Sequence, residues 1–393
     1  MVGARDGVGV FGAAALVTGC CIGGGMLGLP LSCASSGFVP SLLPLLVGWA
    51  YMYLSGFMIL EVYLGVRKPV DLMGLLDTAL GRGAKILGAG LFVFLFYLLL
   101  TAYFDASCTI IRRVLHGWGF ACSTPFCLLL HVVFLFVTLS LRIGKVEAIN
   151  TALLFGMLAF YVCLLCAGLP KVHPERLLLS VDPKSVVWTF PVFIVSFGFQ
   201  NLVPTVAHSL HYDIKRIRSA LFLGTCVTFS IYLVWMLVIL GAMSQGGSGQ
   251  GSNESVLLGL LDRSGTYVAS FIRGFSFFAV ITSLLSVALS CVNFLANSFE
   301  VRKRRFPYIL GVILPPALFS FFNPNLFLTL LHISGGVVAV SLFGLLPVAM
   351  VWKTRYVTRG RYPRLIRGGR GMLIGYGCFS CVVIALTVAE LTR

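Results

Sequence analysis

Two stretches of the sequence decide the fold: GGMLGLP at residues 24–30 and GFQNLVP at residues 198–204. Each lies inside a long apolar run, and in each a glycine stands six residues before a proline. Both residue types interrupt helices, yet an unpaired backbone N–H or C=O in hydrocarbon costs several kcal/mol. An interrupted span is therefore tolerated only where protein or a polar cavity satisfies the freed groups. A pair of such spans in corresponding positions of two halves indicates a transporter's binding site.

The composition places the chain in a lipid bilayer. Of its 393 residues, 58% are hydrophobic and 11% are charged, and the mean hydropathy is +0.98. Soluble domains carry about 25% charged residues, and a membrane span needs about 20 apolar residues. We expect one polytopic membrane domain over residues 1–393, without a soluble domain. Stretches free of charged residues predict eleven all-α spans, at residues 8–34, 39–64, 86–113, 124–141, 147–169, 186–209, 217–243, 266–297, 306–322, 326–352 and 372–391.

The two interrupted spans predict an inverted repeat. Gly24 and Gly198 stand 174 residues apart (198 minus 24), and five spans fit in that interval. Because five is odd, the second unit enters the membrane upside down, as in LeuT-type transporters. We expect a first five-helix repeat at residues 8–169, an inverted one at 186–352 and a peripheral eleventh helix at 372–391. The alternative is that glycine and proline are simply frequent in membrane helices.

Basic residues predict the orientation. Of 29 Lys and Arg, 21 fall on the side of the N-terminus, seven fall on the opposite side, and Arg273 lies within a span. Basic residues stay cytoplasmic, so the N-terminus is expected in the cytoplasm and, with eleven spans, the C-terminus in the periplasm. The net charge of +16 then reflects orientation and attraction to anionic lipid headgroups rather than binding of nucleic acid.

Each helix break predicts a particular chemistry. The half-helix that follows a break offers free N–H groups and a positive dipole end, which suit a carboxylate. The preceding half exposes carbonyls, which suit an ammonium group or a small cation. A zwitterionic amino acid matches both. The candidate substrate-binding residues are Gly23, Gly24, Gly25, Phe197, Gly198, Phe199, Gln200 and Asn201, and the candidate helix-break or hinge residues are Pro30 and Pro204.

Four segments together resemble a known family. They are TGCCIGGGMLGLPLSCASSGF from Thr18, ILEVYLG from Ile59, PVFIVSFGFQNLVPTVAHSL from Pro191 and AVITSLLSVALS from Ala279. They resemble the hydroxy/aromatic amino acid permease family, most closely its bacterial tyrosine- and tryptophan-specific members, over the chain from the first helix to the eleventh.

The resemblance implies a LeuT-like fold and a transporter rather than an enzyme. The implied activity is uptake of tyrosine or tryptophan across the inner membrane by ion symport, with a proton as coupling ion. The implied partners are the amino acid, the ion and membrane lipid, without a cofactor, metal or obligate protein partner. Relatives often carry His at the position of Gln200 and acidic residues near Asn293 and Asn297, so no proton-carrier role transfers to these three positions.

The coupling ion leaves two alternatives open. Asp105 is a carboxylate within a span, and such groups often carry protons; its alternative role is to pair with Arg112 or Arg113. Thr282 and Ser283 could instead place hydroxyls beside carbonyls of the first broken helix and hold a sodium ion near Ser283. Of the remaining charges, Glu61 is expected to be a structural anchor, and the Arg273 side chain can snorkel to the interface.

Specificity for an aromatic side chain rests on the resemblance, with Phe197, Phe199, Tyr97 and Phe278 as a candidate apolar wall. Transport of serine or threonine by the same scaffold is the nearest alternative. A channel or a membrane enzyme is a more remote one, because neither a ring of like charge nor a recognisable catalytic spacing stands out.

The twelve cysteines do not favour a metal or redox site. Nearly all lie within predicted spans, where thiols behave as small apolar groups, and only Cys122 and Cys127 lie near the outer face.

Overall fold

The structure is a computed structural model that describes residues 9–66, 70–117, 119–120, 122–178, 183–242, 266–298, 306–358, 363–366 and 368–392, and these residues contain helices but no strand. In chain order the α-helices are α1 (Val10–Cys21), α2 (Gly25–Ser32), α3 (Phe38–Val66), α4 (Leu72–Leu80), α5 (Arg82–Gly117), α6 (Thr124–Ser140), α7 (Ile143–Gly168), α8 (Pro174–Leu178), α9 (Phe190–Ser196), α10 (Val203–Ser209), α11 (Ile214–Ala242), α13 (Thr266–Ser298), α14 (Phe306–Phe322), α15 (Phe327–Ile333), α16 (Leu346–Trp352) and α17 (Arg370–Leu391). Short 3₁₀ segments are η1 (Leu169–Lys171), η2 (Pro183–Thr189) and η3 (Gln200–Leu202), and π-helical segments are η4 (Ser334–Ala339), η5 (Ser341–Leu345) and η6 (Lys353–Val357).

The all-helical membrane fold is confirmed. Within the described residues, eight helical segments are long and apolar enough to span a membrane, and the pair α1 and α2 forms a ninth span bent by 58°. Two shorter apolar helices, α6 and α14, have 17 residues each. The predicted spans coincide with these elements, although the predicted ends at residues 8 and 243 lie outside the described residues. The total of eleven spans stays a prediction.

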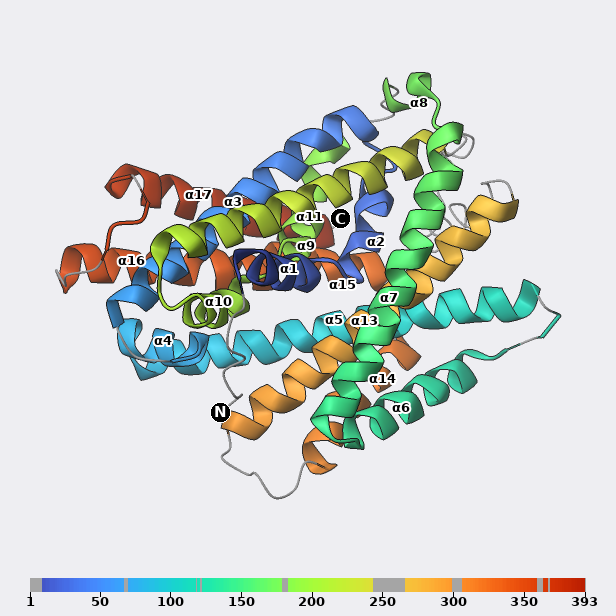
Figure 1. The fold of residues 1–393 in the computed structure, drawn as a ribbon, viewed down its shortest axis with the longest axis horizontal. Coiled ribbons are helices and arrows are strands. Elements are labelled where there is room, and N and C mark those ends of the chain that lie inside the picture. Colours follow the sequence, from blue (N-terminus) through green and yellow to red (C-terminus); the bar gives the residue numbers. More distant parts are fainter. Residues whose placement is uncertain are drawn as a thin grey trace.

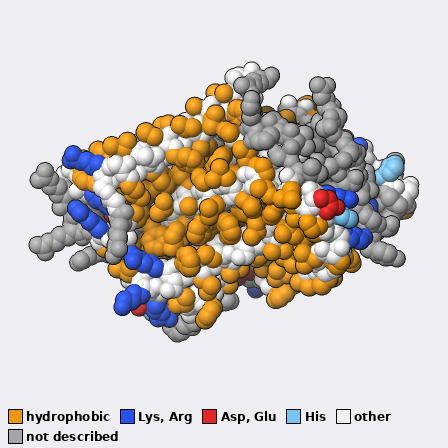
Figure 2. All heavy atoms as spheres, turned by 90° about the horizontal axis from the view of Figure 1, so that it is seen from above, with side chains coloured by type: hydrophobic (Ala, Val, Ile, Leu, Met, Phe, Trp, Pro, Cys, Tyr) orange, Lys and Arg blue, Asp and Glu red, His pale blue; other side chains and the backbone are white. Residues whose placement is uncertain are grey.

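The surface is that of a protein solvated by lipid. Figure 2 shows one face on which hydrophobic side chains form a broad continuous area, with Lys and Arg side chains gathered toward its ends. Large apolar side chains such as Phe11, Phe126 and Phe155 are more than half exposed on these helices. Exposed apolar area of this extent is not found on soluble monomers.

The long helices pack around the two interrupted spans. In Figure 1, α1 and α9 lie in the middle of the bundle, between α11 on one side and α5 and α13 on the other. α1 packs against α11, α9 packs against α3 and η4, and α13 packs against α5 and α7. The residues around the breaks are thereby enclosed by protein, which is the condition for irregular backbone at membrane depth.

The first interruption lies at the glycines and not at the proline. Helix α1 ends at Cys21 and α2 begins at Gly25, whereas Pro30 lies inside α2. A proline in a helix leaves the carbonyl four residues earlier without its N–H partner. Here that carbonyl, of Met26, accepts a hydrogen bond of 3.0 Å from the indole N–H of Trp235 on α11. Pro30 is therefore accommodated within the half-helix, after the break itself, and its role as a hinge stays a prediction.

The second interruption follows the same plan with a longer irregular segment. Helix α9 ends at Ser196, residues Phe197 to Phe199 leave the helical path, and η3 leads into α10. Pro204 is in the first turn of α10, where a missing N–H removes no helical hydrogen bond. Pro204 thus starts the second half-helix a few residues past the break itself.

Candidate functional site

The two interruptions border one cavity of about 260 Å³. Its wall includes the backbone of both breaks, through Gly23, Gly25 and Gly198, together with residues of α1, α3, α5, α7, α9, α13, η4 and η5. Because the lining is drawn from segments more than a hundred residues apart, the cavity exists only when the two halves of the chain are packed together. A water occupies about 30 Å³ of liquid volume, so this space suits one small molecule.

The cavity extends from the breaks toward one end of the bundle. Its lining includes Cys20 near the end of α1, Asn150 in the second turn of α7, Asn201 of η3 and Ser290 in the second half of α13. Asn150 and Ser290 lie toward the end of the bundle at which α5 and α7 begin. The lining residues Cys20 and Asn201 are exposed.

The polar contacts of the cavity connect different helices. The Ser283 hydroxyl of α13 accepts a 2.6 Å hydrogen bond from the Gly24 backbone N–H and donates one of 2.8 Å to the Ala279 carbonyl. Ser286, one turn further along α13, donates to the Asn150 side-chain oxygen over 3.2 Å. Helix α13 thus contacts both the first break and α7 through hydroxyl groups that line the cavity.

The broken helices also contact one another directly. The Cys20 thiol donates to the Gly198 carbonyl over 3.3 Å, so the last turn of α1 meets the second break. On the opposite side of the first break, a methyl group added at Gly25 would lie 3.1 Å from the Ser196 hydroxyl. The absence of side chains at these glycines allows the two backbones to approach closely.

Helix α11 holds both breaks at once. The buried Tyr232 hydroxyl oxygen lies 2.6 Å from the Cys21 carbonyl oxygen and 2.8 Å from the Ser196 carbonyl oxygen. Cys21 and Ser196 are the last residues of the half-helices that precede the two breaks. One side chain therefore serves a freed carbonyl of each broken helix, which is the requirement set by the apolar surroundings.

The apolar part of the wall comes largely from α5. Phe92, Phe96 and Tyr103 line the cavity, together with Phe343 of η5. The Tyr103 ring covers the first break so closely that a Cβ atom at Gly24 would overlap it. Aromatic faces of this kind stack with aromatic ligands.

The aromatic wall expected from the sequence is not the one that lines the cavity. Phe197 is fully buried and packs on Tyr232, with ring centroids 5.1 Å apart, and Phe199 is fully buried against Gly56 of α3. Of the other two candidates, Tyr97 donates from its hydroxyl to the Gly311 carbonyl. These side chains lie in the protein packing behind the break, because the backbone of the break itself occupies the cavity wall.

Phe278, the fourth expected aromatic residue, stacks on Phe160 at 5.5 Å instead of lining the cavity.

Gln200 also lies behind the wall. Its side-chain N–H donates to the Met52 carbonyl over 3.1 Å, and the residue is fully buried. Its Oε1 is buried without a hydrogen-bond partner among the described residues. Met52 itself lines the cavity, so Gln200 contacts a lining residue without lining the cavity itself. Of the eight candidate substrate-binding residues, those that line the cavity are Gly23, Gly25, Gly198 and Asn201.

The candidate ion-coupling residues separate into two places. Thr282 and Ser283 line the cavity, and the Thr282 hydroxyl lies within hydrogen-bond distance of the carbonyls of Phe278 and Ala279, one turn earlier in its own helix. Asp105 instead accepts hydrogen bonds of 3.0 Å from the backbone N–H groups of Asn325 and Phe327. Its carboxylate thereby caps the start of α15, a position at which the helix dipole favours negative charge.

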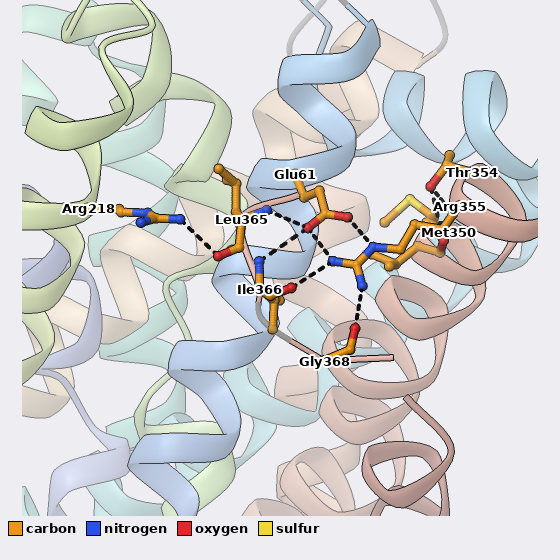
Figure 3. Close-up of polar contacts among 9 residues, drawn as sticks. Glu61, Arg218, Met350, Thr354, Arg355, Leu365, Ile366 and Gly368 are labelled. Atoms are coloured by element: carbon orange, nitrogen blue, oxygen red, sulfur yellow. Dashed lines mark hydrogen bonds and ion pairs between the residues drawn. The ribbon is translucent and has the colours of Figure 1, made fainter. Parts of the chain in front are cut away.

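Glu61 forms a buried ionic cluster at the end of the bundle where α3 finishes, shown in Figure 3. Its two carboxylate oxygens accept from the Arg355 guanidinium at 2.5 and 2.6 Å, and Oε2 also accepts from the backbone N–H of Leu365 at 2.9 Å. Arg355 in turn donates to the carbonyls of Ile366 and Gly368. The cluster fastens the segment before α17 to α3 and η6, in agreement with the expected anchor role.

Several residues of the site have no signal in the sequence. Tyr232, Trp235 and Tyr103 are aromatic residues in apolar helices, and nothing in their local pattern distinguishes them from the other aromatic residues of the chain. Asn150 is an exception. It is a polar residue near the start of an apolar span, which is the kind of position that a search for intramembrane polar groups would have found.

Comparisons with known proteins identify both the fold and the family. A structure that the fold resembles is that of MhsT in complex with L-phenylalanine, with a TM-score of 0.63 and 14% sequence identity, over 96% of this chain and 98% of that one. MhsT has the LeuT fold, so the LeuT-like fold is confirmed. Among curated proteins, tyrosine-specific transport system 1 of Haemophilus influenzae is 29% identical over 92% of each chain. The tryptophan-specific transport protein of Pseudomonas aeruginosa is 27% identical, over 83% of this chain and 82% of that protein.

The model of the tryptophan/tyrosine permease family matches residues 7–387. The chain therefore belongs to the tryptophan/tyrosine permease family.

Proposed function

We propose that the protein is a secondary active transporter that imports tyrosine or tryptophan across the inner membrane, with the helix breaks as its binding site. The observation that carries this proposal is the single cavity of about 260 Å³ bordered by both breaks. Backbone groups of Gly23, Gly25 and Gly198 line it and would take the carboxylate and ammonium of an amino acid. Phe92, Phe96 and Tyr103 would take its aromatic ring.

The cavity geometry corresponds to the inward-facing state if the basic residues orient the chain as expected. The end at which α5 and α7 begin is then cytoplasmic, and we propose that the cavity opens toward it beside the exposed lining residues Cys20 and Asn201. The end where α5 finishes is then periplasmic, and so is the C-terminus after α17. Uptake requires a second, outward-facing state in which rearrangement around the breaks closes this path.

We propose a proton as the coupling ion. A sodium ion beside α13 and the first break would need oxygen atoms directed at it. Ser283 instead accepts an amide N–H from Gly24 and donates its own hydrogen to Ala279, which leaves its oxygen one lone pair for a cation. Helix α13 and the first break are thus joined by a direct hydrogen bond. Sodium coupling remains the alternative, with Thr282 and Ser283 as ligands.

Ion substitution in proteoliposomes tests the coupling. The purified protein is reconstituted, and uptake of labelled tyrosine is followed under an inward proton gradient, with sodium or choline as the only other cation at fixed pH. We expect saturable accumulation that requires the proton gradient and changes little when choline replaces sodium. Accumulation that depends on sodium and not on the pH gradient would contradict proton coupling, and uptake without any gradient dependence would contradict symport.

Competition in the same vesicles tests the substrate. Unlabelled tryptophan, tyrosine and phenylalanine are expected to inhibit more strongly than serine or threonine, because the wall contains Phe92, Phe96 and Phe343, whose rings can pack against an aromatic side chain. Stronger inhibition by serine or threonine would support the alternative substrate class of the same scaffold.

A further inference from the structure

The connection between α5 and α6 carries two cysteines that the transport site does not use. The sulfur atoms of Cys122 and Cys127 are 3.0 Å apart. Cys127 is fully buried, and Cys122 is partly exposed just before α6. The contact brings together two groups that can form a covalent bond.

The backbone at the start of α6 explains why they meet. Ser123 is the residue that precedes the first turn, with extended backbone angles of φ −77° and ψ 151°, and its carbonyl accepts the Cys127 N–H over 3.2 Å. Cys122 therefore occupies the position before the cap and Cys127 the fourth position of the helix. Apolar residues at these two positions commonly pack together and fix the angle at which the chain enters a helix. In this chain both residues of that pair are thiols.

The position of Cys127 is fixed by a contact within its own helix. The Cys127 carbonyl accepts a 2.7 Å hydrogen bond from Nδ1 of His131, one turn further along α6. The same ring nitrogen lies 3.9 Å from the Cys108 sulfur on α5. The first turns of α6 are thus packed against α5, and Cys127 stays in place while the chain before the helix brings Cys122 to it.

We propose that Cys122 and Cys127 form a disulfide on the outer face of the membrane. The proposal rests on the orientation given under the proposed function, because disulfides persist in the periplasm and not in the cytoplasm. Each thiol loses one proton, and the pair loses two electrons, to a disulfide-bearing thiol oxidase. One Cys sulfur attacks the oxidant's disulfide, and the other displaces the resulting mixed bond. The products are one protein disulfide and two oxidant thiols.

Counting free thiols in the whole protein tests the proposal. Cells are lysed in denaturant with excess N-ethylmaleimide, so that no thiol can oxidise afterwards, and intact masses are compared with and without prior reduction. The chain has twelve cysteines, so a single disulfide predicts ten adducts before reduction and twelve after it. Twelve adducts before reduction would overturn the proposal.

Single substitutions identify the partners. C122S and C127S each leave eleven thiols, and both are expected to show eleven adducts before and after reduction. The control C163A, on α7, removes a thiol outside the pair and is expected to rise from nine adducts to eleven. If C122S instead rises from nine to eleven, the disulfide joins another pair, such as Cys108 with Cys127, and the assignment of Cys122 is overturned.

Uptake by the unsubstituted protein, measured beside its thiol count, separates this proposal from the transport function. Tyrosine accumulation in a protein with twelve free thiols would overturn the disulfide and leave the proposed function in place. Ten free thiols in a protein that accumulates no amino acid would support the disulfide and overturn the proposed transport function.

Discussion

At the scale of single residues, the first break depends on the absence of one side chain. Replacing Gly24 by Ala would place a Cβ atom against Cε1 of the Tyr103 ring, too close for two carbon atoms. Overpacking of this kind costs about 1–3 kcal/mol, so we expect tyrosine uptake to fall by roughly tenfold or more while membrane insertion stays normal. Gly90→Ala on α5 is the control, because a methyl group there meets nothing within 4 Å and Gly90 does not line the cavity. Equal uptake by the two variants, measured per amount of inserted protein, would contradict this role for Gly24.

The second break is expected to be more tolerant. A methyl group at Gly198 would meet only the Val195 carbonyl oxygen, at 3.1 Å, and no ring. We therefore expect Gly198→Ala to retain more uptake than Gly24→Ala, measured in the same vesicles. If Gly198→Ala lost more uptake than Gly24→Ala, crowding of the added methyl group would not explain the effect of either substitution.

At the scale of helices, Tyr232 links α11 to both broken spans. Tyr232→Phe removes the hydroxyl near the Cys21 and Ser196 carbonyls, and a buried group left unsatisfied costs about 1–3 kcal/mol. We expect a lower thermal denaturation temperature in detergent. Tyr161→Phe is the control, because the Tyr161 hydroxyl serves only the Ile231 carbonyl, within a regular helix. A denaturation temperature lowered equally by both changes would argue against a special place for Tyr232.

Asp105 links α5 to the start of α15, and its contacts favour a structural role. Asp105→Asn removes the charge and replaces one of two acceptor oxygens, so we expect a loss of about 1.5–3 kcal/mol for a charged hydrogen bond. Substrate exchange and proton-driven accumulation should then fall in parallel, because a loosened α15 affects both. Loss of accumulation with exchange intact would identify Asp105 as a proton carrier instead.

At the scale of the whole molecule, the Glu61 cluster joins α3 to the C-terminal part of the chain. Removing one partner of a buried ion pair costs about 3–5 kcal/mol, because the other charge stays buried. We expect Glu61→Gln or Arg355→Gln to lower the denaturation temperature strongly, and the double change Glu61→Leu with Arg355→Met to recover part of it. Recovery is incomplete because the Leu365 N–H also loses its acceptor.

The exposed pair of Lys85 and Asp77 provides the control for that experiment. The charged atoms are 3.2 Å apart, but both side chains are 40% exposed or more. Exposed pairs contribute about 0–1 kcal/mol, so Asp77→Asn is expected to leave the denaturation temperature nearly unchanged. A large effect there would mean that charge, and not burial, sets the cost at Glu61.

Local pattern was enough to find the spans and both breaks, because apolar runs and glycines act through the backbone within a few residues. It does not show that Trp235, more than two hundred residues away, satisfies the Met26 carbonyl that Pro30 leaves without a helical partner. It also placed Phe197 and Phe199 in the wall, although burial at a break does not say which side of the backbone faces the cavity. Contacts of this kind form only when distant helices pack, so no local sequence pattern predicts them.

The Tyr232 hydroxyl has a consequence for ligand recognition. A phenol carries one hydrogen, whereas each carbonyl oxygen can accept two hydrogen bonds. The Cys21 and Ser196 carbonyls share that one hydrogen, and both residues border the cavity. These two oxygens therefore have fewer donors than they can accept, and the three N–H bonds of a protonated amine would supply more. The bound amine would then share the Cys21 and Ser196 carbonyl oxygens with the Tyr232 hydroxyl. Binding of an amino acid would therefore also change the contact that links the two broken helices.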